Sequence, residues 1–346
     1  MRYARRWVTR TPVVVVALVS LAACSTGTGS STETVSPHES KQLSGITSPS
    51  RPVPSVVIRG QLLFTRTTNG DVQTIYAMSG HRERRLTVPG HFCCLLRVSP
   101  IHRRILVMPG GDITPPVTGG TINLDGGHFQ RLKLTDPTLN LVPQAWSPDG
   151  SRIAFEGWDD SDPGRTGVYT ARASDGGARV RVTSRPGQSH DIPLDYSPNG
   201  KWLVFYRSAA VDPDAQIGGS LWVVGVDGSD AHQVAGPTSQ PAPWARWSKD
   251  SRRILFANER TASSGALWTV APDGRQLTKL FSDAQGRFPL APTWSPDGSH
   301  TIFALDPTSD EFAHPDNGLY MITAQGADLR LVNGSQDFKR QLECWH

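Results

Sequence analysis

The chain has 346 residues, of which 19% are charged and 8% aromatic, with 33 Gly and 27 Pro. This composition is typical of a loop-rich globular protein and excludes a wholly disordered one. The formal charge of +4 comes from Arg2, Arg5, Arg6 and Arg10, because no acidic residue precedes position 24. The rest of the chain is neutral, which argues against nucleic acid as a partner.

The N-terminus predicts a signal peptide over residues 1–23. Its basic stretch is followed by an apolar run from Val13 to Ala23. This run is about half as long as the ~20 residues that a helix needs to span a bilayer. The run ends at Leu-Ala-Ala-Cys24, which resembles the lipobox of bacterial lipoproteins. The resemblance implies that Cys24 is lipidated and becomes the N-terminus after cleavage. We therefore expect a lipid-anchored protein on the extracytoplasmic side of the cell membrane; ordinary cleavage beside an incidental Cys is the alternative.

Residues 24–54 are predicted to form a disordered tether. Ser, Thr, Gly and Pro account for 20 of the 30 positions from 25 to 54. The segment therefore has too few apolar residues to build a core. The folded domain is expected to occupy residues 55–346.

A five-residue phrase recurs through this domain at intervals of 47 to 51 residues. It reads WSPDG at 146–150, YSPNG at 196–200, WSKDS at 247–251 and WSPDG at 294–298, with a degraded copy, VSPIH, at 98–102. Such a period is typical of propeller blades or solenoid units. Pro presets φ, Asp bonds the neighbouring backbone and Gly accepts positive φ, so each copy predicts a tight turn.

Each unit predicts four short antiparallel strands. In the unit of Trp146, the first strand ends at that residue, and the others are Arg152–Phe155, Val168–Thr170 and Arg179–Thr183. This pattern matches a propeller blade. Two classes of position recur in register and are predicted to pack between blades. They are Val107, Phe155, Phe205, Phe256 and Phe303 in the second strands, and Tyr76, Tyr169, Trp222, Trp268 and Tyr320 in the third.

The first unit lacks its first strand, because Gln61–Phe64, Thr74–Ala77 and Arg84–Thr87 correspond to strands two to four. Trp345 lies 51 residues after Trp294, in phase with the repeat. The C-terminal strand is therefore predicted to complete the first blade. The fold expected is an all-β, six-bladed β-propeller of four-stranded antiparallel blades, closed by pairing the two ends of the domain.

Closure of this kind brings Cys344 close to Cys93 and Cys94 of the second blade. We predict a disulfide between Cys344 and one of these two residues, since an exported protein meets oxidising conditions. The alternative is that all three are small buried hydrophobic residues.

The turn phrase, the second strand with its Phe, the aromatic third strand and the Asp-Gly turn resemble the repeats of the TolB-type β-propeller family. The resemblance covers residues 57–346. It implies the fold and a role in extracytoplasmic binding or envelope assembly. The Pal-binding role of TolB does not carry over, because TolB has an N-terminal α/β domain where this chain has its tether. Related propellers also occur in prolyl oligopeptidases and some sugar lyases.

The sequence offers little support for catalysis. It contains no G-x-S-x-G motif, and no residues remain for an α/β-hydrolase domain. Ser189, His190 and Asp191 do not read as a triad, because three consecutive residues cannot orient one another. No ligand spacing for a metal is present, so neither a metal nor a cofactor is predicted.

Propeller topology divides the chain between two faces. The turns after the first strands and before the fourth strands are short and share the short-turn face. The loops between strands two and three, and between blades, share the long-loop face, where binding residues are expected. The longest are Gly157–Gly167, Arg207–Ser220, Ala257–Ala266 and Ala304–Gly318.

Segments that enter the inner strands converge near the axis on the long-loop face, and they supply candidates for a funnel that binds a small polar or anionic ligand. These are His91, His190, Asp191, Trp244, Arg287, Lys339 and Arg340. The alternative is that they satisfy buried backbone groups. The long loops also carry acids that favour either solvated loops or a site for calcium or a cationic partner. These are Asp159, Asp160, Asp162, Asp212, Asp214, Asp306, Asp310, Glu311 and Asp316.

These observations favour a monomeric, non-catalytic binding or scaffold module that contacts an envelope protein, peptide or glycan through the long-loop face. The alternative is a lyase- or hydrolase-type enzyme with a small polar substrate in the axial funnel.

Overall fold

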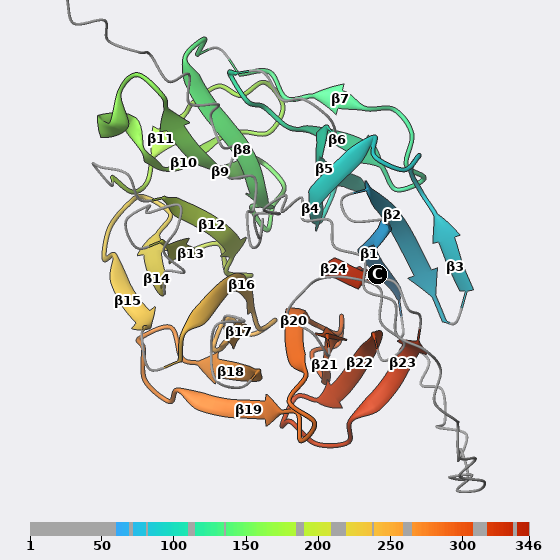
Figure 1. The fold of residues 1–346 in the computed structure, drawn as a ribbon. Coiled ribbons are helices and arrows are strands. Elements are labelled where there is room, and N and C mark those ends of the chain that lie inside the picture. Colours follow the sequence, from blue (N-terminus) through green and yellow to red (C-terminus); the bar gives the residue numbers. More distant parts are fainter. Residues whose placement is uncertain are drawn as a thin grey trace, which may run out of the picture.

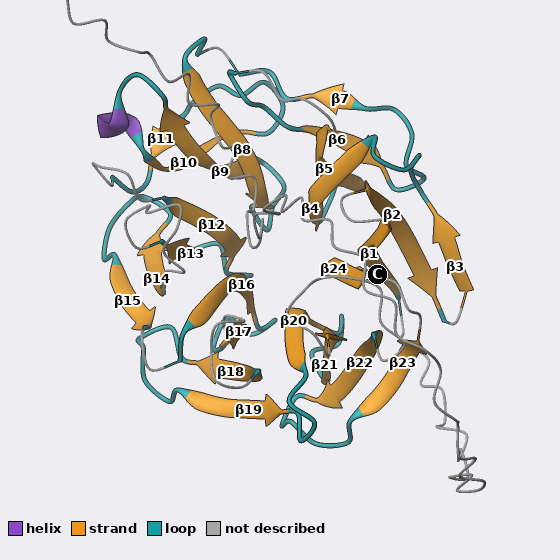
Figure 2. Cartoon of the chain, in the orientation of Figure 1, coloured by secondary structure: helices purple, strands orange, loops and turns teal. Residues whose placement is uncertain are grey.

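The computed structural model describes residues 60–68, 72–80, 82–109, 115–134, 136–184, 190–208, 219–236, 239–258, 265–306, 317–334 and 338–345. Six four-stranded antiparallel sheets stand around a central axis (Figure 1). Figure 2 shows one short helical turn, η1 (Pro163–Arg165), among the strands of the described residues. The six-bladed all-β propeller predicted from the repeat is confirmed. Within the described ranges, no helix is long and apolar enough to cross a membrane.

The first three blades contain the N-terminal half of the ring and the C-terminal strand. Blade 1 is β24 (Phe338–Trp345), β1 (Gln61–Thr68), β2 (Val72–Ser79) and β3 (Arg82–Arg85). Blade 2 is β4 (Phe92–Val98), β5 (Arg104–Pro109), β6 (Gly120–Asn123) and β7 (Gln130–Arg131). Blade 3 is β8 (Leu139–Trp146), β9 (Arg152–Asp159), β10 (Gly167–Arg172) and β11 (Val180–Arg181).

The remaining blades follow the same order from the axis outward. Blade 4 is β12 (Asp191–Tyr196), β13 (Trp202–Arg207), β14 (Ser220–Gly225) and β15 (His232–Ala235). Blade 5 is β16 (Pro241–Trp247), β17 (Ile254–Asn258), β18 (Ala266–Val270) and β19 (Thr278–Ser282). Blade 6 is β20 (Phe288–Trp294), β21 (His300–Asp306), β22 (Gly318–Thr323) and β23 (Arg330–Gly334).

The ring is closed by the C-terminal strand, as predicted. β24 pairs antiparallel with β1, with Trp345 opposite Gln61 and Cys344 opposite Leu62. It also neighbours β4 of blade 2 and β20 of blade 6. The side chains of Cys93, Cys94 and Cys344 lie outside the described part of the structure, so the disulfide stays a prediction.

The recurring phrase forms the turn between the first two strands. In blade 3, the Gly150 N–H donates to Ser147 O at 2.8 Å, and Gly150 has φ +67°. The Ser147 hydroxyl donates to Asp149 Oδ1 at 2.6 Å, and the same carboxylate oxygen accepts from the Ser151 N–H at 3.0 Å. Local side-chain hydrogen bonds therefore fix the turn, which explains why the phrase recurs.

The tryptophan of the phrase also joins consecutive blades. The indole Nε1 of Trp146 donates to Arg97 O of blade 2 at 3.2 Å, and that of Trp294 donates to Arg246 O of blade 5 at 3.4 Å. The Asp-Gly turns reach back in the same way: a Cβ on Gly176 would lie 1.8 Å from Lys133 O of the preceding blade. The repeat therefore encodes both the blade and its contact with the preceding one.

The aromatic positions pack as predicted. The second-strand side chains Phe155, Phe205, Phe256 and Phe303 are essentially inaccessible to solvent and lie in the clusters between blades. Four of the five third-strand rings are half-buried rather than buried, and all five carry a cation within 6 Å of the ring centroid. Cation–π contacts therefore cover the outer part of each of these five blades.

Candidate functional site

A histidine at the junction of blades 3 and 4 is held by a buried carboxylate. His190 comes directly before β12, and its Nδ1–H donates to Glu156 Oε1 of β9 at 2.8 Å. The Glu156 side chain is 1% exposed and that of His190 is 17% exposed. The ring of Trp158, also on β9, meets the imidazole edge at a centroid distance of 5.8 Å. The pair therefore presents a fixed imidazole beside a half-buried indole at the long-loop end of the blades.

The environment of His190 changes its proton affinity. Burial acts to lower its pKa, but the hydrogen bond with Glu156 and the negative charges of Glu156 and Asp191 outweigh this, so the pKa is raised above 6.5. Because Nδ1 carries the proton shared with Glu156, Nε2 is the atom that exchanges protons or accepts a hydrogen bond.

We expect this pair to make stability depend on pH. A raised folded-state pKa contributes stability that is complete below about pH 6.5 and is lost as pH rises through the raised pKa. The free-energy difference between wild type and Glu156→Gln, measured by urea unfolding, should therefore shrink as pH rises from about 5 to about 9. The exposed-histidine variant His128→Gln serves as the control, and a Glu156→Gln difference independent of pH would contradict the assignment.

Asp191, the next candidate, is built into the same junction. It is completely buried and accepts two hydrogen bonds from Arg207, Nε to Oδ1 and Nη2 to Oδ2, both at 2.8 Å. The Thr183 hydroxyl donates to Oδ2 at 2.7 Å. Arg207 in turn lies 4.4 Å from the centroid of the Trp222 ring. The contacts with Arg207 lie within blade 4, and the Thr183 hydroxyl joins blade 3 to it, so Asp191 acts here as a structural group.

The other candidates lie in different surroundings. Arg287 forms an ion pair with Asp283 at 2.8 Å and donates to the Tyr320 hydroxyl at 3.0 Å. Trp244 is half-buried against two apolar clusters, one between blades 5 and 6 and one between blades 6 and 1. His91 is exposed, with its ring edge toward Phe92.

The side chains of Lys339 and Arg340 lie outside the described residues, although their backbones pair with Arg66 and Thr65 of β1. Among the described candidates, only His190 and Asp191 are brought together, and a shared ligand funnel stays a prediction.

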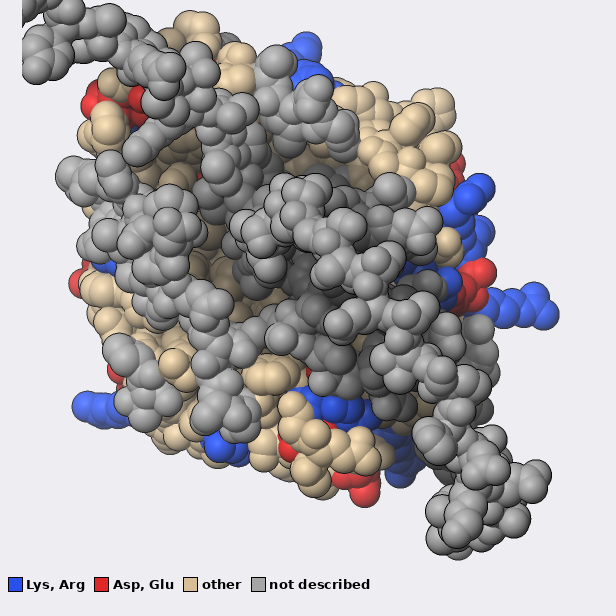
Figure 3. All heavy atoms as spheres, viewed as in Figure 1, with Lys and Arg blue, Asp and Glu red and all other residues tan. Residues whose placement is uncertain are grey.

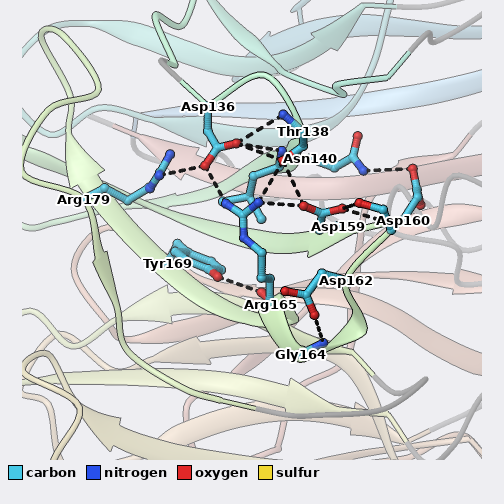
Figure 4. Close-up of polar contacts among 12 residues, drawn as sticks. Asp136, Thr138, Asn140, Asp159, Asp160, Asp162, Gly164, Arg165, Tyr169 and Arg179 are labelled. Atoms are coloured by element: carbon cyan, nitrogen blue, oxygen red, sulfur yellow. Dashed lines mark hydrogen bonds and ion pairs between the residues drawn. The ribbon is translucent and has the colours of Figure 1, made fainter.

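The acids of the first long loop belong to a hydrogen-bond network drawn in Figure 4. Arg165 donates to Asp159 Oδ2 at 2.6 Å and to Asp136 Oδ2 at 2.5 Å, and Arg179 binds Asp136 at 2.9 Å. Asp162 caps η1 by accepting from the Gly164 N–H at 2.9 Å. These carboxylates are therefore occupied by the protein's own donors.

The pKa values agree with this pairing. Burial acts to raise the pKa of Asp136, but hydrogen bonds from the Thr138 N–H and Arg165 lower it to about 2. Hydrogen bonds from Ser161 hold the pKa of Asp159 well below its usual value. Among the described residues, no group of three or more His, Cys, Asp or Glu is placed to hold a metal ion. Asp212, Asp214, Asp310, Glu311 and Asp316 lie outside them, and Asp306 is buried.

A set of charged residues at the axis was not predicted from the sequence. Arg97 and Arg246 both approach the Glu343 carboxylate, with Nη1 and Nη2 at 3.9 and 3.1 Å from Oε2. Arg97 Nη2 also donates to Leu194 O at 3.3 Å. The Arg246–Glu343 pair and the Arg97–Leu194 hydrogen bond each join blades that are not neighbours, so they cross the axis, whereas Arg97 and Glu343 belong to the neighbouring blades 2 and 1. Arg97, Asp195 and Arg246 each directly precede an anchor of the repeat, a shared position that marks them in the sequence.

The axial charges are strongly affected by burial. Burial raises the pKa of Asp195 to about 6, although Arg246 and Arg97 act to lower it. Burial and the charge of Arg246 lower the pKa of Arg97 to about 9. The Asp195 carboxylate also accepts from the Trp247 N–H at 3.0 Å. Two cations and two carboxylates thus form a nearly balanced group that links four inner strands.

Figure 3 shows one face of the molecule, on which the described Lys and Arg side chains lie scattered around the rim with Asp and Glu among them. No single charge dominates the described surface in this view. The local arrangement of His190 and Trp158 is therefore a more specific feature than the overall charge.

Comparison with known proteins identifies relatives of the fold. No family model matches the chain. The chain is 26% identical over 211 residues to an uncharacterized protein, Atu1656, of Agrobacterium fabrum. The alignment covers 58% of this chain and 59% of the relative. The match therefore spans about three fifths of the length of that relative.

Three solved structures are similar in architecture. TolB from Acinetobacter baumannii has a TM-score of 0.59 and 14% identity, over 84% of this chain and 67% of that one. A chain of a nidogen/laminin complex has a TM-score of 0.55 and 12% identity, over 82% and 97%. Oligogalacturonate lyase from Vibrio parahaemolyticus has a TM-score of 0.51 and 10% identity, over 79% of each chain. The fold is TolB-like, and it occurs in an enzyme as well as in a protein complex.

Proposed function

We propose that this protein is an extracytoplasmic binding module, lipid-anchored through Cys24, that contacts an envelope protein, peptide or glycan through its long-loop face. The observation that carries the proposal is the pair formed by His190 and Trp158. Both rings are half-buried, and the imidazole is fixed by its hydrogen bond to the buried Glu156. A rigid indole beside a hydrogen-bonding group is typical of the residues that dominate binding energy at interfaces.

The surrounding charges support a binding role. Asp191, Arg207, Arg287 and Asp283 are engaged in ion pairs within or between blades. These side chains lose little conformational entropy when a partner binds, because the fold has already ordered them. The likeness to TolB and to a chain of a nidogen/laminin complex is in keeping with a propeller used for binding.

Site-specific photocrosslinking tests the face. A photoreactive phenylalanine analogue replaces Trp158 on the long-loop face or, as control, the exposed Lys249 on the short-turn face. In intact cells, we expect a discrete crosslinked species from position 158 that is absent from position 249. Equal crosslinking at both positions, or none from 158 while 249 reacts, would refute the assignment of the face.

The anchor is tested separately. Metabolic labelling with a fatty-acid analogue should mark the wild-type protein and leave Cys24→Ser unlabelled. Labelling that persists in Cys24→Ser would refute lipidation at this residue.

A second candidate function is a lyase-type enzyme, and it is favoured by the geometry of His190. Glu156 holds the imidazole so that Nε2 is the basic nitrogen, the arrangement of an oriented general base. The similarity in fold to an oligogalacturonate lyase suggests the substrate to try. Formation of an unsaturated product from oligogalacturonate, abolished in His190→Gln, would favour the enzyme; no turnover by the wild type would favour binding.

A further inference from the structure

A basic cleft lies between blades 2 and 3 on the short-turn face, and neither His190 nor Trp158 lines it. Its volume is about 360 Å³, and it is bordered by the β4–β5 turn, the β8–β9 turn and the end of β10. Five of its lining residues are basic: His102, Arg104, Arg131, Lys133 and Arg172. None of the lining residues is Asp or Glu.

Most of this positive charge is not balanced by neighbouring carboxylates. Arg104 donates to uncharged acceptors, which are Thr121 Oγ1 at 2.7 Å, Asn123 Oδ1 at 2.7 Å and the Thr121 and His128 carbonyls. Arg131 donates to Thr118 Oγ1 at 3.0 Å and to Thr118 O at 3.4 Å.

The nearby acids are already engaged elsewhere. Asp175 pairs with Arg172 at 2.6 Å. Asp149, in the adjacent turn, accepts from Ser147 and Ser151 and lines the next cleft instead. The described groups around the basic cleft therefore leave a net positive charge in it.

An equivalent cleft lies between blades 3 and 4, and comparing the two shows which basic residues recur with the repeat. Arg152 there corresponds to Arg104, and it makes the same kind of contacts, with Thr170 Oγ1 and Ala178 O, both at 2.8 Å. That second cleft is lined by Asp149 as well as Arg152. The arginine at this repeat position is thus explained by the fold. The exposed Arg131 and Lys133 line the first cleft, whereas Arg152 is the only Lys or Arg among the described residues that line the second.

We propose that the basic cleft binds a phosphate group. Guanidinium and ammonium donors that converge on one cleft, without carboxylates among its lining residues, form the environment that phosphate oxygens require. Arg131 and Lys133 would supply the charged donors, while Arg104 is held in place by its four contacts. The cleft and the long-loop face are independent, so either proposal can fail alone.

The test uses pyrophosphate, titrated by calorimetry into the folded protein at low salt. We expect measurable binding that weakens as salt is added, and a loss of affinity of at least about tenfold in the double variant Arg131→Gln/Lys133→Gln. The control is Arg252→Gln/Arg275→Gln, which removes the same charge from exposed positions of blade 5 on the same face. Its affinity should stay within about twofold of wild type.

A second arm distinguishes free phosphate from a lipid headgroup. Sedimentation with phosphatidylglycerol vesicles, compared with phosphatidylcholine vesicles, is measured for the same three proteins. If binding is lost in Arg131→Gln/Lys133→Gln but not in the control variant, the proposal that the cleft binds phosphate is supported. The arm in which this loss occurs identifies the source of the phosphate. Absence of binding by the wild type in both arms, or an equal loss in the control variant, overturns the proposal.

Discussion

Removal of residues 338–346 is expected to abolish the cooperative fold. β24 supplies the inner strand of blade 1 and pairs along β1 from Gln61 to Thr67. Without it, β1 becomes an open sheet edge, and Glu343 no longer bridges Arg97 and Arg246. We expect aggregation in size-exclusion chromatography and loss of the near-ultraviolet circular dichroism of the tryptophans. A soluble monomer with wild-type spectra would contradict this expectation.

A circular permutant provides the matched control. Because β24 and β1 are antiparallel and Trp345 lies opposite Gln61, a short loop can join residue 345 to residue 61 as a hairpin. A chain that begins at residue 338, continues through this loop into β1 and ends at 334 should regain the wild-type spectra. If the permutant lacked the wild-type spectra while the truncated chain kept them, closure by β24 would not be what stabilises the ring.

Asp191→Ala is expected to destabilise the protein by about 3–5 kcal/mol, because it leaves the Arg207 guanidinium without its buried partner. The Arg207 side chain is only 15% exposed, so water cannot replace the two lost hydrogen bonds. Urea unfolding followed by tryptophan fluorescence measures the change. A loss below about 1 kcal/mol would show that the pair is solvated in solution.

Two further variants separate the buried charge from other effects of Asp191→Ala. Asp175→Ala removes an ion pair whose side chains are about half exposed, and it should cost much less than Asp191→Ala. Asp191→Ala/Arg207→Met removes both buried charges and should be more stable than Asp191→Ala alone. If the double variant were the less stable, the packing of Arg207 on Trp222 would outweigh its charge.

The sequence was most informative where structure depends on neighbouring residues. The turn at Ser147–Gly150 is held by hydrogen bonds among residues five or fewer positions apart, so its chemistry is visible in each copy. The spacing of these turns predicted the number of blades and the pairing of β24 with β1. Strand lengths were less certain: β9 runs from Arg152 to Asp159 rather than ending at Phe155, and β11 contains two residues.

The candidate site depends instead on contacts between residues that are far apart in the sequence. His190 was selected from the sequence, but its partner Glu156 lies 34 positions earlier on another blade. Arg97 and Arg246 were overlooked, although each precedes an anchor residue, because the preceding position is not polar in every copy: Ala145 occupies it in blade 3. Their role became visible only when contacts across the axis were known.

By itself, the sequence determined the six-bladed ring and its closure, because both follow from local turn chemistry repeated at a constant interval. It also predicted a leader and tether at the N-terminus, which lie outside the described residues. Only the tertiary structure decided which charges are buried and paired, which cross the axis, and which remain available in the cleft between blades 2 and 3. The physical reason is that burial and pairing depend on residues distant in the sequence, 16 positions apart for Asp191 and Arg207 and 97 apart for Arg246 and Glu343, and no local pattern specifies which of them meet.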